Sequence, residues 1–468
     1  MSYPRSVLRE YWAGEWPRLW RICRWMLGIA LILTPFAFFA PAPRTAIALL
    51  AVAMVSIVVG RRLLAGRDMH AVLLRRWQSA MSAHVQAAWP ELAHTLRLQI
   101  RTLDGLAIFA GLGTPRWEGM TLVAPVALPR GLVREELVAA SERIAQAFSA
   151  TRASVHGQQI GLLELHLEFV DALGEPFTAP LGGSWDGGSV SMGIAEGGGE
   201  WRLRVGPHTL VAGSSGSGKA SLVWGLLMGL VGPIHDGTVQ VWGIDRKGGM
   251  ELAMGRALLT RFADDAPLAV ALLEDAVATM QTRARELAGH TRQHLASVES
   301  PTVIILIDEL AALTAYETDR DLLRRANAAL ATLASQGRAV GFVVFACLQD
   351  PRKETLPARG LFTQTIGLRL RDRTETAMVL GDGAVEGGAR CHEISPATPG
   401  VAYVVPEDGT PPMRVRAAHV PDEQIRDAAL SYFAPTQIPI VIPEAPREPK
   451  RAPRTRQSRR SSDTQEES

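Results

Sequence analysis

The feature that most restricts the fold of this chain is a glycine-rich segment, Gly213–Lys219, between a short apolar run and a stretch that favours helix. Its three glycines allow a backbone path in which successive N–H groups point into one concavity at the start of a helix. Such a concavity binds phosphate oxygens, and Lys219 would reach the outer phosphates of a nucleoside triphosphate such as ATP. The alternative is a glycine-rich turn that binds no nucleotide. The predicted phosphate loop comprises Gly213, Ser214, Ser215, Gly216, Ser217, Gly218, Lys219, Ala220 and Ser221.

The helix after this loop departs from the usual pattern. In that pattern the lysine is followed by Ser or Thr, whose hydroxyl is a ligand of Mg²⁺. Here the next residue is Ala220, and Ser221 stands one position out of register, which makes it the weaker candidate for a metal ligand. Water can replace the missing hydroxyl, because Mg²⁺ keeps several water molecules when it binds nucleotides. The departure therefore bears on the rate of hydrolysis more than on nucleotide binding.

An acidic pair follows a second apolar run. Asp308 and Glu309 come directly after Val303–Ile307, about ninety residues beyond the glycine loop. At the end of a buried strand, Asp308 is placed to hold Mg²⁺ directly or through water, and Glu309 is placed to polarise an attacking water molecule. The alternative is a pair of solvated acids at a strand end. With the phosphate loop upstream, the pair predicts nucleotide hydrolysis.

Two further polar residues flank the next apolar run. Arg338 stands just before Phe342–Cys347, and Gln349 stands just after it. A glutamine at the end of a strand beside the acidic strand can sense the outermost phosphate. An arginine before the strand can reach the nucleotide of a neighbouring subunit, as arginine fingers do. The alternative for both residues is ordinary polarity at the ends of a strand.

From residue 208 onward the chain alternates between apolar runs and helical patterns. Continuous apolar runs of this kind, separated by helices, are typical of a parallel sheet that is covered on both faces. The sequence therefore predicts an α/β fold. The expected strands cover 209–212, 239–244, 303–307, 342–347 and 365–370. The clearest helices between them cover 268–287 and 321–336, and a last helix is expected over 417–433.

The first 64 residues contain two uncharged stretches. One has 19 residues between Arg24 and Arg44, and the other has 16, from Thr45 to Gly60. A bilayer span needs roughly 20 residues, so the first stretch is long enough to cross the membrane. The second stretch is short, and it can span only if its flanking arginines extend their side chains to the membrane surface. Arginines on both flanks predict a multi-pass protein of the cell membrane with both termini in the cytoplasm. The alternative is a buried or interfacial helical hairpin.

These features divide the chain into predicted segments. A net charge of +2 excludes nucleic-acid binding through overall positive charge, and three widely spaced cysteines fit a reducing compartment. The arginine-rich tail is compatible with binding of phosphates, anionic lipid or neither. The segments are an N-terminal cytoplasmic piece (1–24), a two-span hairpin (25–64), a helical stem (65–119, with helix expected over 68–110), a small α+β domain (120–200), a nucleotide-binding α/β domain (201–434) and a disordered basic tail (435–468).

Five long segments of residues 201–434 carry a resemblance: LVAGSSGSGKASLVWGLL, VQVWGIDRKGGMELAMGR, VIILIDELAALTAY, SQGRAVGFVVFACLQDPRK and TETAMVLGDGA. They resemble the motor domain of FtsK/SpoIIIE-type DNA translocases, so the resemblance implies an ATPase motor domain over 201–434. They are most similar to the plasmid-transfer ATPases of actinobacteria, the TraB/TraSA type. The resemblance covers roughly half the chain, and two membrane spans ahead of the motor agree with it.

The resemblance implies a RecA-like P-loop core that assembles into a ring, expected to be a hexamer, around double-stranded DNA. It implies ATP and Mg²⁺ as cofactors. Arg338 matches the family's arginine finger, which acts across a subunit interface, and Asp245 and Lys247 match a family motif of underived role. The residues that it places at the nucleotide are Lys219, Asp308, Glu309 and Gln349.

Three functions are compatible with these features. The first is a membrane-anchored, ATP-driven translocase of double-stranded DNA for conjugative transfer of a plasmid or an integrative element. The second is an FtsK-like ATPase of a protein secretion system, although such proteins usually carry several motor domains. The third is a membrane scaffold that binds ATP without hydrolysing it. Only about 35 residues follow the last predicted helix, too few for a winged-helix DNA-reading module.

Overall fold

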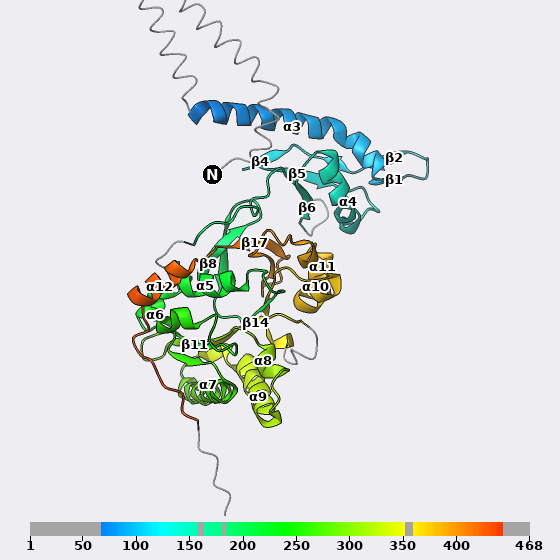
Figure 1. The fold of residues 1–468 in the computed structure, drawn as a ribbon. Helices are drawn as coiled ribbons and strands as arrows, with labels where there is room; N and C mark the ends of the chain where they lie inside the picture. Colours follow the sequence, from blue (N-terminus) through cyan, green and yellow to red (C-terminus); the bar gives the residue numbers. More distant parts are fainter. Residues whose placement is uncertain (1–66, 158–162, 180–183, 352–358, 443–468) are drawn as a thin grey trace, which may run out of the picture.

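A computed structural model describes residues 67–157, 163–179, 184–351 and 359–442. The predicted N-terminal segment, the two-span hairpin and most of the basic tail lie outside these residues. Among the helices that are described, none combines the length and the apolar composition needed to cross a bilayer. Figure 1 shows an N-terminal unit above a larger unit that contains the glycine-rich loop.

The larger unit is built on one ten-stranded mixed sheet. Its strands are parallel from β12 to β15 and antiparallel from β15 to β9. The five predicted strands all lie in the parallel part, so the predicted α/β fold is confirmed. In spatial order the strands are β12 (Arg261–Ala263), β11 (Val239–Ile244), β13 (Thr302–Ile307), β14 (Phe342–Leu348), β10 (Thr209–Ala212), β15 (Gln364–Gly367), β16 (Val401–Val405), β17 (Met413–Ala417), β8 (Ser189–Ala195) and β9 (Glu200–Arg204).

Helices cover both faces of the parallel strands. In β13, Ile304 and Leu306 join one core cluster, whereas Ile305 and Ile307 join another on the opposite face. Both faces are therefore dry, which explains why the strand is continuously apolar. The first cluster includes residues of α5 (Lys219–Gly229), α6 (Val231–His235) and α12 (Asp422–Ser431), and the second those of α7 (Ala266–Leu287), α8 (Ala311–Thr314) and α9 (Arg320–Gln336).

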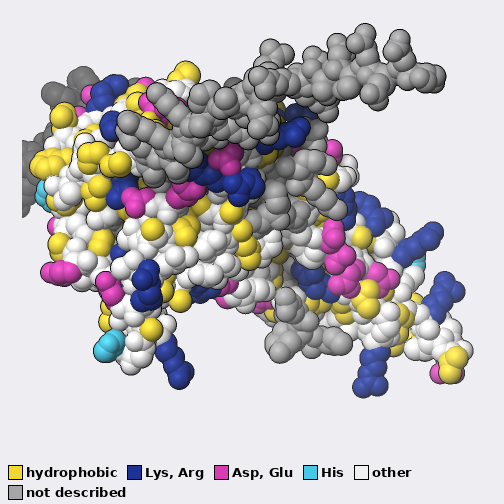
Figure 2. Space-filling model, turned by 90° about the horizontal axis from the view of Figure 1, so that it is seen from below, with side chains coloured by type: hydrophobic (Ala, Val, Ile, Leu, Met, Phe, Trp, Pro, Cys, Tyr) yellow, Lys and Arg dark blue, Asp and Glu magenta, His cyan; other side chains and the backbone are white. Residues whose placement is uncertain are grey.

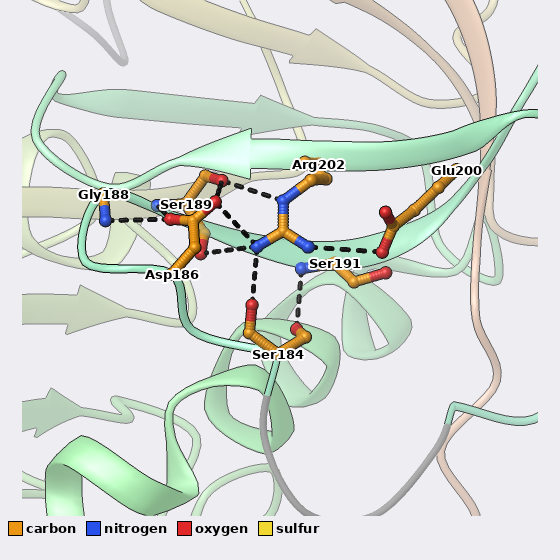
Figure 3. A network of polar contacts seen from close by, with 7 residues as sticks. All are labelled: Ser184, Asp186, Gly188, Ser189, Ser191, Glu200 and Arg202. Carbon is orange, nitrogen blue, oxygen red and sulfur yellow. Dashed lines mark hydrogen bonds and ion pairs between the residues drawn. The ribbon is translucent and has the colours of Figure 1, made fainter.

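The β8–β9 hairpin belongs to this sheet. Arg202 ties the hairpin to the segment before it, because its guanidinium donates to the Ser184 carbonyl at 2.6 Å and to the Ser189 hydroxyl at 3.0 Å (Figure 3). It also pairs with Asp186 at 3.0 Å. The predicted boundary between residues 200 and 201 falls inside this hairpin. The glycine-rich and serine-rich stretch 181–200 is compatible, from its sequence, with hairpin turns or a loose linker, and the structure has the hairpin.

The N-terminal unit is a helix packed against a small antiparallel sheet. The helix α3 (Arg67–Thr95) ends well before residue 110, so the expected helix over 68–110 is wrong beyond Thr95. After the helix, Arg97 takes a positive φ of 58° and the chain turns into strands. The remaining elements are β1 (Gln99–Arg101), β2 (Ala107–Phe109), β3 (Gly111–Leu112), β4 (Arg116–Glu118), β5 (Thr121–Ala127), α4 (Arg134–Ala147), β6 (Arg152–His156) and β7 (Leu163–Glu168).

Buried charges join the two units. Arg152 of β6 pairs with Glu196, which follows β8, and Arg414 of β17 makes two 3.0 Å bonds to Asp171. Glu168 of β7 is buried in the same cluster. Burial, together with the nearby Glu196 charge, raises the pKa of the Glu168 carboxyl to about 8.

This carboxyl predicts a loss of stability as pH rises. The folded protein holds the Glu168 proton up to about pH 8, whereas the unfolded chain releases it near the ordinary pKa of 4.5. Stability should therefore fall between about pH 5 and pH 8. Thermal midpoints across this range should fall less in Glu168→Gln than in the parent. Glu118→Gln, at an exposed carboxylate of the same unit, should follow the parent. Parallel profiles for the parent and Glu168→Gln would contradict the assignment.

The chain beyond α12 is ordered further than expected. The Ala434 amide donates to the Ala257 carbonyl and the Ile438 amide to the Thr260 carbonyl, both at 2.8 Å. Ile440 packs against the core cluster that contains α7. The start of the predicted disordered tail at residue 435 is therefore wrong for 435–442, and residues 443–468 lie outside the described part.

Candidate nucleotide site

The glycine-rich segment connects β10 to α5 at the carboxyl edge of the parallel strands. Gly213 donates its amide to the Leu348 carbonyl at 3.1 Å, which ties the loop to the neighbouring strand β14. Gly216 and Gly218 have φ values of 71° and 99°, which side chains with a Cβ rarely adopt. The helix begins at Lys219, so the loop forms the concavity at a helix N-terminus that phosphate binding requires.

Close packing also explains two of the glycines. A Cβ on Gly218 would overlap the backbone of Gly400, whose amide donates to the Ser217 carbonyl at 2.9 Å. A Cβ on Gly213 would lie 2.7 Å from the Cβ of Leu368. The loop is therefore held in shape from two sides, by the residues after β15 and by the turn before β16.

Lys219 lies across this loop. Its ammonium donates to the Gly213 carbonyl at 2.6 Å and to the Ser214 carbonyl at 3.2 Å. Burial lowers its pKa below the ordinary value, while the carboxylates of Glu309 and Asp308 favour the charged form. A lysine held over the loop and facing carboxylates is suited to binding the outer phosphates of a nucleotide.

The two predicted carboxylates lie beyond the end of β13, and they are unusually buried for acids. Asp308 is 4% exposed and Glu309 is 6% exposed. Burial raises the pKa of Glu309, although its Oε1 accepts the Gln349 amide at 3.3 Å. A carboxylate with a raised pKa binds a proton more readily, which is what a general base for water requires.

Sequence reasoning left the roles of Asp245 and Lys247 open. Asp245, after β11, is fully buried and accepts the amides of Lys247, Glu251 and Leu252 at 2.8–3.0 Å. This shapes the loop so that the Lys247 ammonium donates to Asp308 Oδ2 at 2.9 Å. Burial lowers the pKa of Lys247, but the bond to Asp308 and the charges of Asp308, Glu309 and Asp245 together outweigh it, so the pKa lies above its ordinary value.

Arg369 and Gly400 were missed as contributors to the loop. The Arg369 carbonyl accepts both the amide and the hydroxyl of Ser214 at 2.9 Å, and its guanidinium donates to the Ser215 carbonyl at 3.0 Å. Most of these bonds use backbone atoms, which carry no residue-type signal. Only the guanidinium of Arg369 offered such a signal, and an arginine after a strand is too common to single out.

The structure brings most of the predicted site together but places Arg338 elsewhere. Gln349 follows β14 at the loop edge, whereas Arg338 precedes β14 at the opposite edge. Seven strand residues separate them, which is about 20 Å at 3.3 Å per residue. Arg338 pairs there with Glu407, in the connection between β16 and β17. It is half-exposed and too far away to serve the nucleotide of its own chain.

ATP and Mg²⁺ fit these residues. The loop presents amides and a lysine for the phosphates, and Asp308 and Glu309 supply the carboxylate oxygens that Mg²⁺ prefers. Ser221 is half-buried in the first turn of α5, and Ala220 is exposed beside it. The phosphates would thus meet the loop, and the cation would meet Asp308.

Comparison with known proteins agrees with this architecture. Residues 190–301 match the sequence model of the FtsK/SpoIIIE family. The ESX-4 secretion system protein EccC4 of Mycobacterium tuberculosis is 31% identical over 153 residues, which is 29% of this chain and 12% of that protein. The DNA translocase FtsK of Bacillus cereus is 24% identical over 247 residues, 48% of this chain and 29% of that protein.

A solved structure of the pCW3 conjugation coupling protein TcpA, in a monomer form with ATPγS, is also similar. It is 18% identical, has a TM-score of 0.48, and the match covers 75% of this chain and 99% of that one. The matches to EccC4 and FtsK span less than a third of those proteins. The family match begins at residue 190, inside β8, so it includes the hairpin that the structure assigns to the ten-stranded sheet. Residues 190–301 are therefore part of a P-loop ATPase domain of the FtsK/SpoIIIE type.

Proposed function

We propose that this chain is a membrane-anchored ATPase that moves double-stranded DNA, for conjugative transfer of a plasmid or an integrative element. The observation that carries the proposal is the meeting of Lys219, Asp308 and Glu309 at one edge of the sheet. In this proposal Lys219 binds the phosphates, Asp308 holds Mg²⁺, Glu309 activates water and Gln349 senses the outermost phosphate. The FtsK/SpoIIIE match and the DNA translocases among the relatives support DNA as the cargo.

The place of Arg338 supports a ring. An arginine on the edge of the sheet away from its own phosphate loop can act on a nucleotide only in an adjacent subunit. Head-to-tail interfaces of this kind close into rings when the rotation between subunits allows it. We therefore propose a homo-oligomeric ring, a hexamer by analogy with the family, with Arg338 as the finger that crosses each interface.

The membrane anchor and the division into segments are part of the proposal. The two uncharged stretches within 25–64, flanked by arginines, support a two-span hairpin with both termini in the cytoplasm. The antiparallel sheet over 111–168 shares one core cluster with α3, which supports a small α+β domain that includes the predicted stem. The membership of β8 in the larger sheet moves the proposed start of the motor domain to about residue 189.

One face of the molecule gives no simple guide to where DNA would bind. On the face seen in Figure 2, the basic and acidic side chains of the described residues are interspersed. Phosphate contacts usually gather positive charge in a stripe or patch. By analogy with the family, whose ring surrounds the DNA, we expect the DNA contacts on the surface that lines the inside of the assembled ring.

DNA-dependent ATP turnover tests this function. The full chain, purified with its anchor in lipid nanodiscs, should hydrolyse ATP severalfold faster when linear double-stranded DNA is added. The stimulation should weaken as salt is raised, because phosphate contacts release counterions. Heparin at matched charge serves as the control polyanion. An ATP turnover rate that DNA does not change would contradict DNA as the cargo. Absence of ATP turnover under all conditions would contradict the proposed ATPase activity.

A protein secretion ATPase is the second candidate. The 31% identity to the secretion protein EccC4 favours it, since it exceeds the identity to the DNA translocases. Turnover stimulated by a secreted protein but not by DNA would support this candidate. A third candidate, an ATP-binding scaffold, predicts nucleotide binding without turnover, unchanged by Glu309→Gln.

A further inference from the structure

The carboxylate of Asp308 is paired with a lysine side chain of the same protein. The Lys247 ammonium donates to Asp308 Oδ2 at 2.9 Å, and the Asp308 side chain is only 6% exposed. The lysine reaches this position from a loop whose three amides are bound by the buried Asp245. The neighbouring Arg246 turns away and pairs with Glu317 at 2.9 Å. The ammonium is thus positioned by a built loop.

The residue type at this position is informative. The chain contains 49 basic residues, yet lysine occurs only at positions 219, 247, 353 and 450. Within the described residues both lysines, Lys219 and Lys247, lie at the nucleotide site. An ammonium is a compact point charge on a flexible stem, whereas a guanidinium is a rigid planar fork that pairs strongly with carboxylates. A site that must release its carboxylate is better served by lysine.

We propose that Lys247 and Mg²⁺ compete for the same oxygen of Asp308, so that the metal–nucleotide complex displaces the lysine when it binds. This inference rests on the proposed ATPase function and adds a residue that sets the Mg²⁺ requirement. An ammonium and a divalent cation cannot both contact one carboxylate oxygen of this buried group without strong repulsion. The lysine side chain is 42% exposed, so it can swing out without disturbing the core.

The departure at Ala220 increases the weight of this competition. Because alanine offers no hydroxyl, Mg²⁺ at this site relies more heavily on Asp308 than in loops with Ser or Thr at that position. A residue that occupies the Asp308 carboxylate therefore determines how readily Mg²⁺ binds. Lys247 also lies on the loop that carries Glu251, and Glu251 accepts the Trp224 indole N–H at 3.1 Å. Because Trp224 belongs to α5, displacement of Lys247 from Asp308 is coupled to this helix through the loop.

The test is the Mg²⁺ dependence of nucleotide binding by the full chain in nanodiscs. The probe is a fluorescent, non-hydrolysed ATP analogue, titrated with Mg²⁺ from EDTA-treated buffer. In Lys247→Met, the Mg²⁺ concentration for half-maximal tight binding should fall about tenfold, because the competing charge is gone. Lys247→Arg keeps a cation on Asp308 and should need at least as much Mg²⁺ as the parent. Arg246→Met, the matched control in the same loop, should leave the requirement unchanged.

The outcomes separate this inference from the proposed function. An unchanged or higher Mg²⁺ requirement in Lys247→Met, with binding otherwise intact, overturns the competition while the ATPase proposal stands. If Lys247→Met weakens nucleotide binding equally in EDTA and in Mg²⁺, Lys247 contacts the phosphates or supports the loop. That result also overturns the proposed competition. A parent chain that binds no nucleotide defeats the proposed function first. Thermal midpoints of the variants identify any that have lost the fold.

Discussion

Lys219→Ala should abolish ATP turnover and most nucleotide binding. The Lys219 ammonium spans the loop through the carbonyls of Gly213 and Ser214 and faces the carboxylates of Asp308 and Glu309. Without it, a triphosphate would meet these two buried acids with much less compensation, so binding should weaken strongly. Removing one preorganised electrostatic partner from such sites lowers the rate about 10²–10³-fold. Turnover and analogue binding, measured with and without DNA, check the prediction.

Glu309→Gln is the matched control at the same site. Gln keeps the size of the side chain and an oxygen for the Gln349 amide, but it cannot accept a proton from water. Turnover should fall about 10²–10⁴-fold while nucleotide binding stays within severalfold of the parent. Loss of binding in Lys219→Ala together with retained binding in Glu309→Gln separates phosphate contact from chemistry. ATP turnover near the parent rate in Lys219→Ala would contradict the catalytic role assigned to the phosphate loop.

The parallel half of the sheet could be predicted because burial on both faces leaves a plain signal. Ile304 and Ile305 face opposite cores, so the strand must be apolar throughout. The carboxyl ends of such strands meet at one edge, and this is why loop residues and acids ninety positions apart could be predicted to share a site. The spacing and residue types of Lys219, Asp308 and Glu309 were enough to predict that they form one nucleotide site.

The antiparallel half could not be predicted in the same way. β8 and β17 pair across more than two hundred residues, and the glycine-rich sequence around β8 is as compatible with a linker as with hairpin turns. Gly193 shows why it is not one, because a Cβ there would overlap the Arg416 carbonyl of the adjacent strand. That glycine is required by close approach of two backbones, which leaves no periodic pattern in the sequence. The small strands after Thr95 were missed for a related reason, since each is only two or three residues long.

The loop of Asp245 illustrates the remaining limit within the site. The sequence placed both Asp245 and Lys247 after a strand, but three backbone amides on one carboxylate are visible only in three dimensions. The consequence, a lysine delivered to Asp308, follows from that backbone shape. Residue type alone could not distinguish it from a solvated lysine in a turn.

Arg338→Ala should abolish turnover in a pure ring and yet be rescued by a second inactive subunit. Arg338 lies before β14 and Gln349 after it, so the arginine cannot reach the nucleotide of its own chain. If each active site takes Glu309 from one subunit and Arg338 from the next, Arg338→Ala loses about 10³–10⁵-fold in rate. Mixed rings with Glu309→Gln would then contain some interfaces with both groups intact.

The arithmetic of mixing makes this a sharp test. In rings assembled from equal amounts of Arg338→Ala and Glu309→Gln chains, about one interface in four joins an intact glutamate to an intact arginine. Turnover should recover toward that fraction. Rings that mix Lys219→Ala with Glu309→Gln should not recover, because both groups act on the nucleotide of the same subunit. Co-expression with two affinity tags selects the mixed rings, and ATP turnover is the readout. Absence of rescue in tag-verified mixed rings would leave Arg338 with only its pairing to Glu407, a structural contact within one subunit.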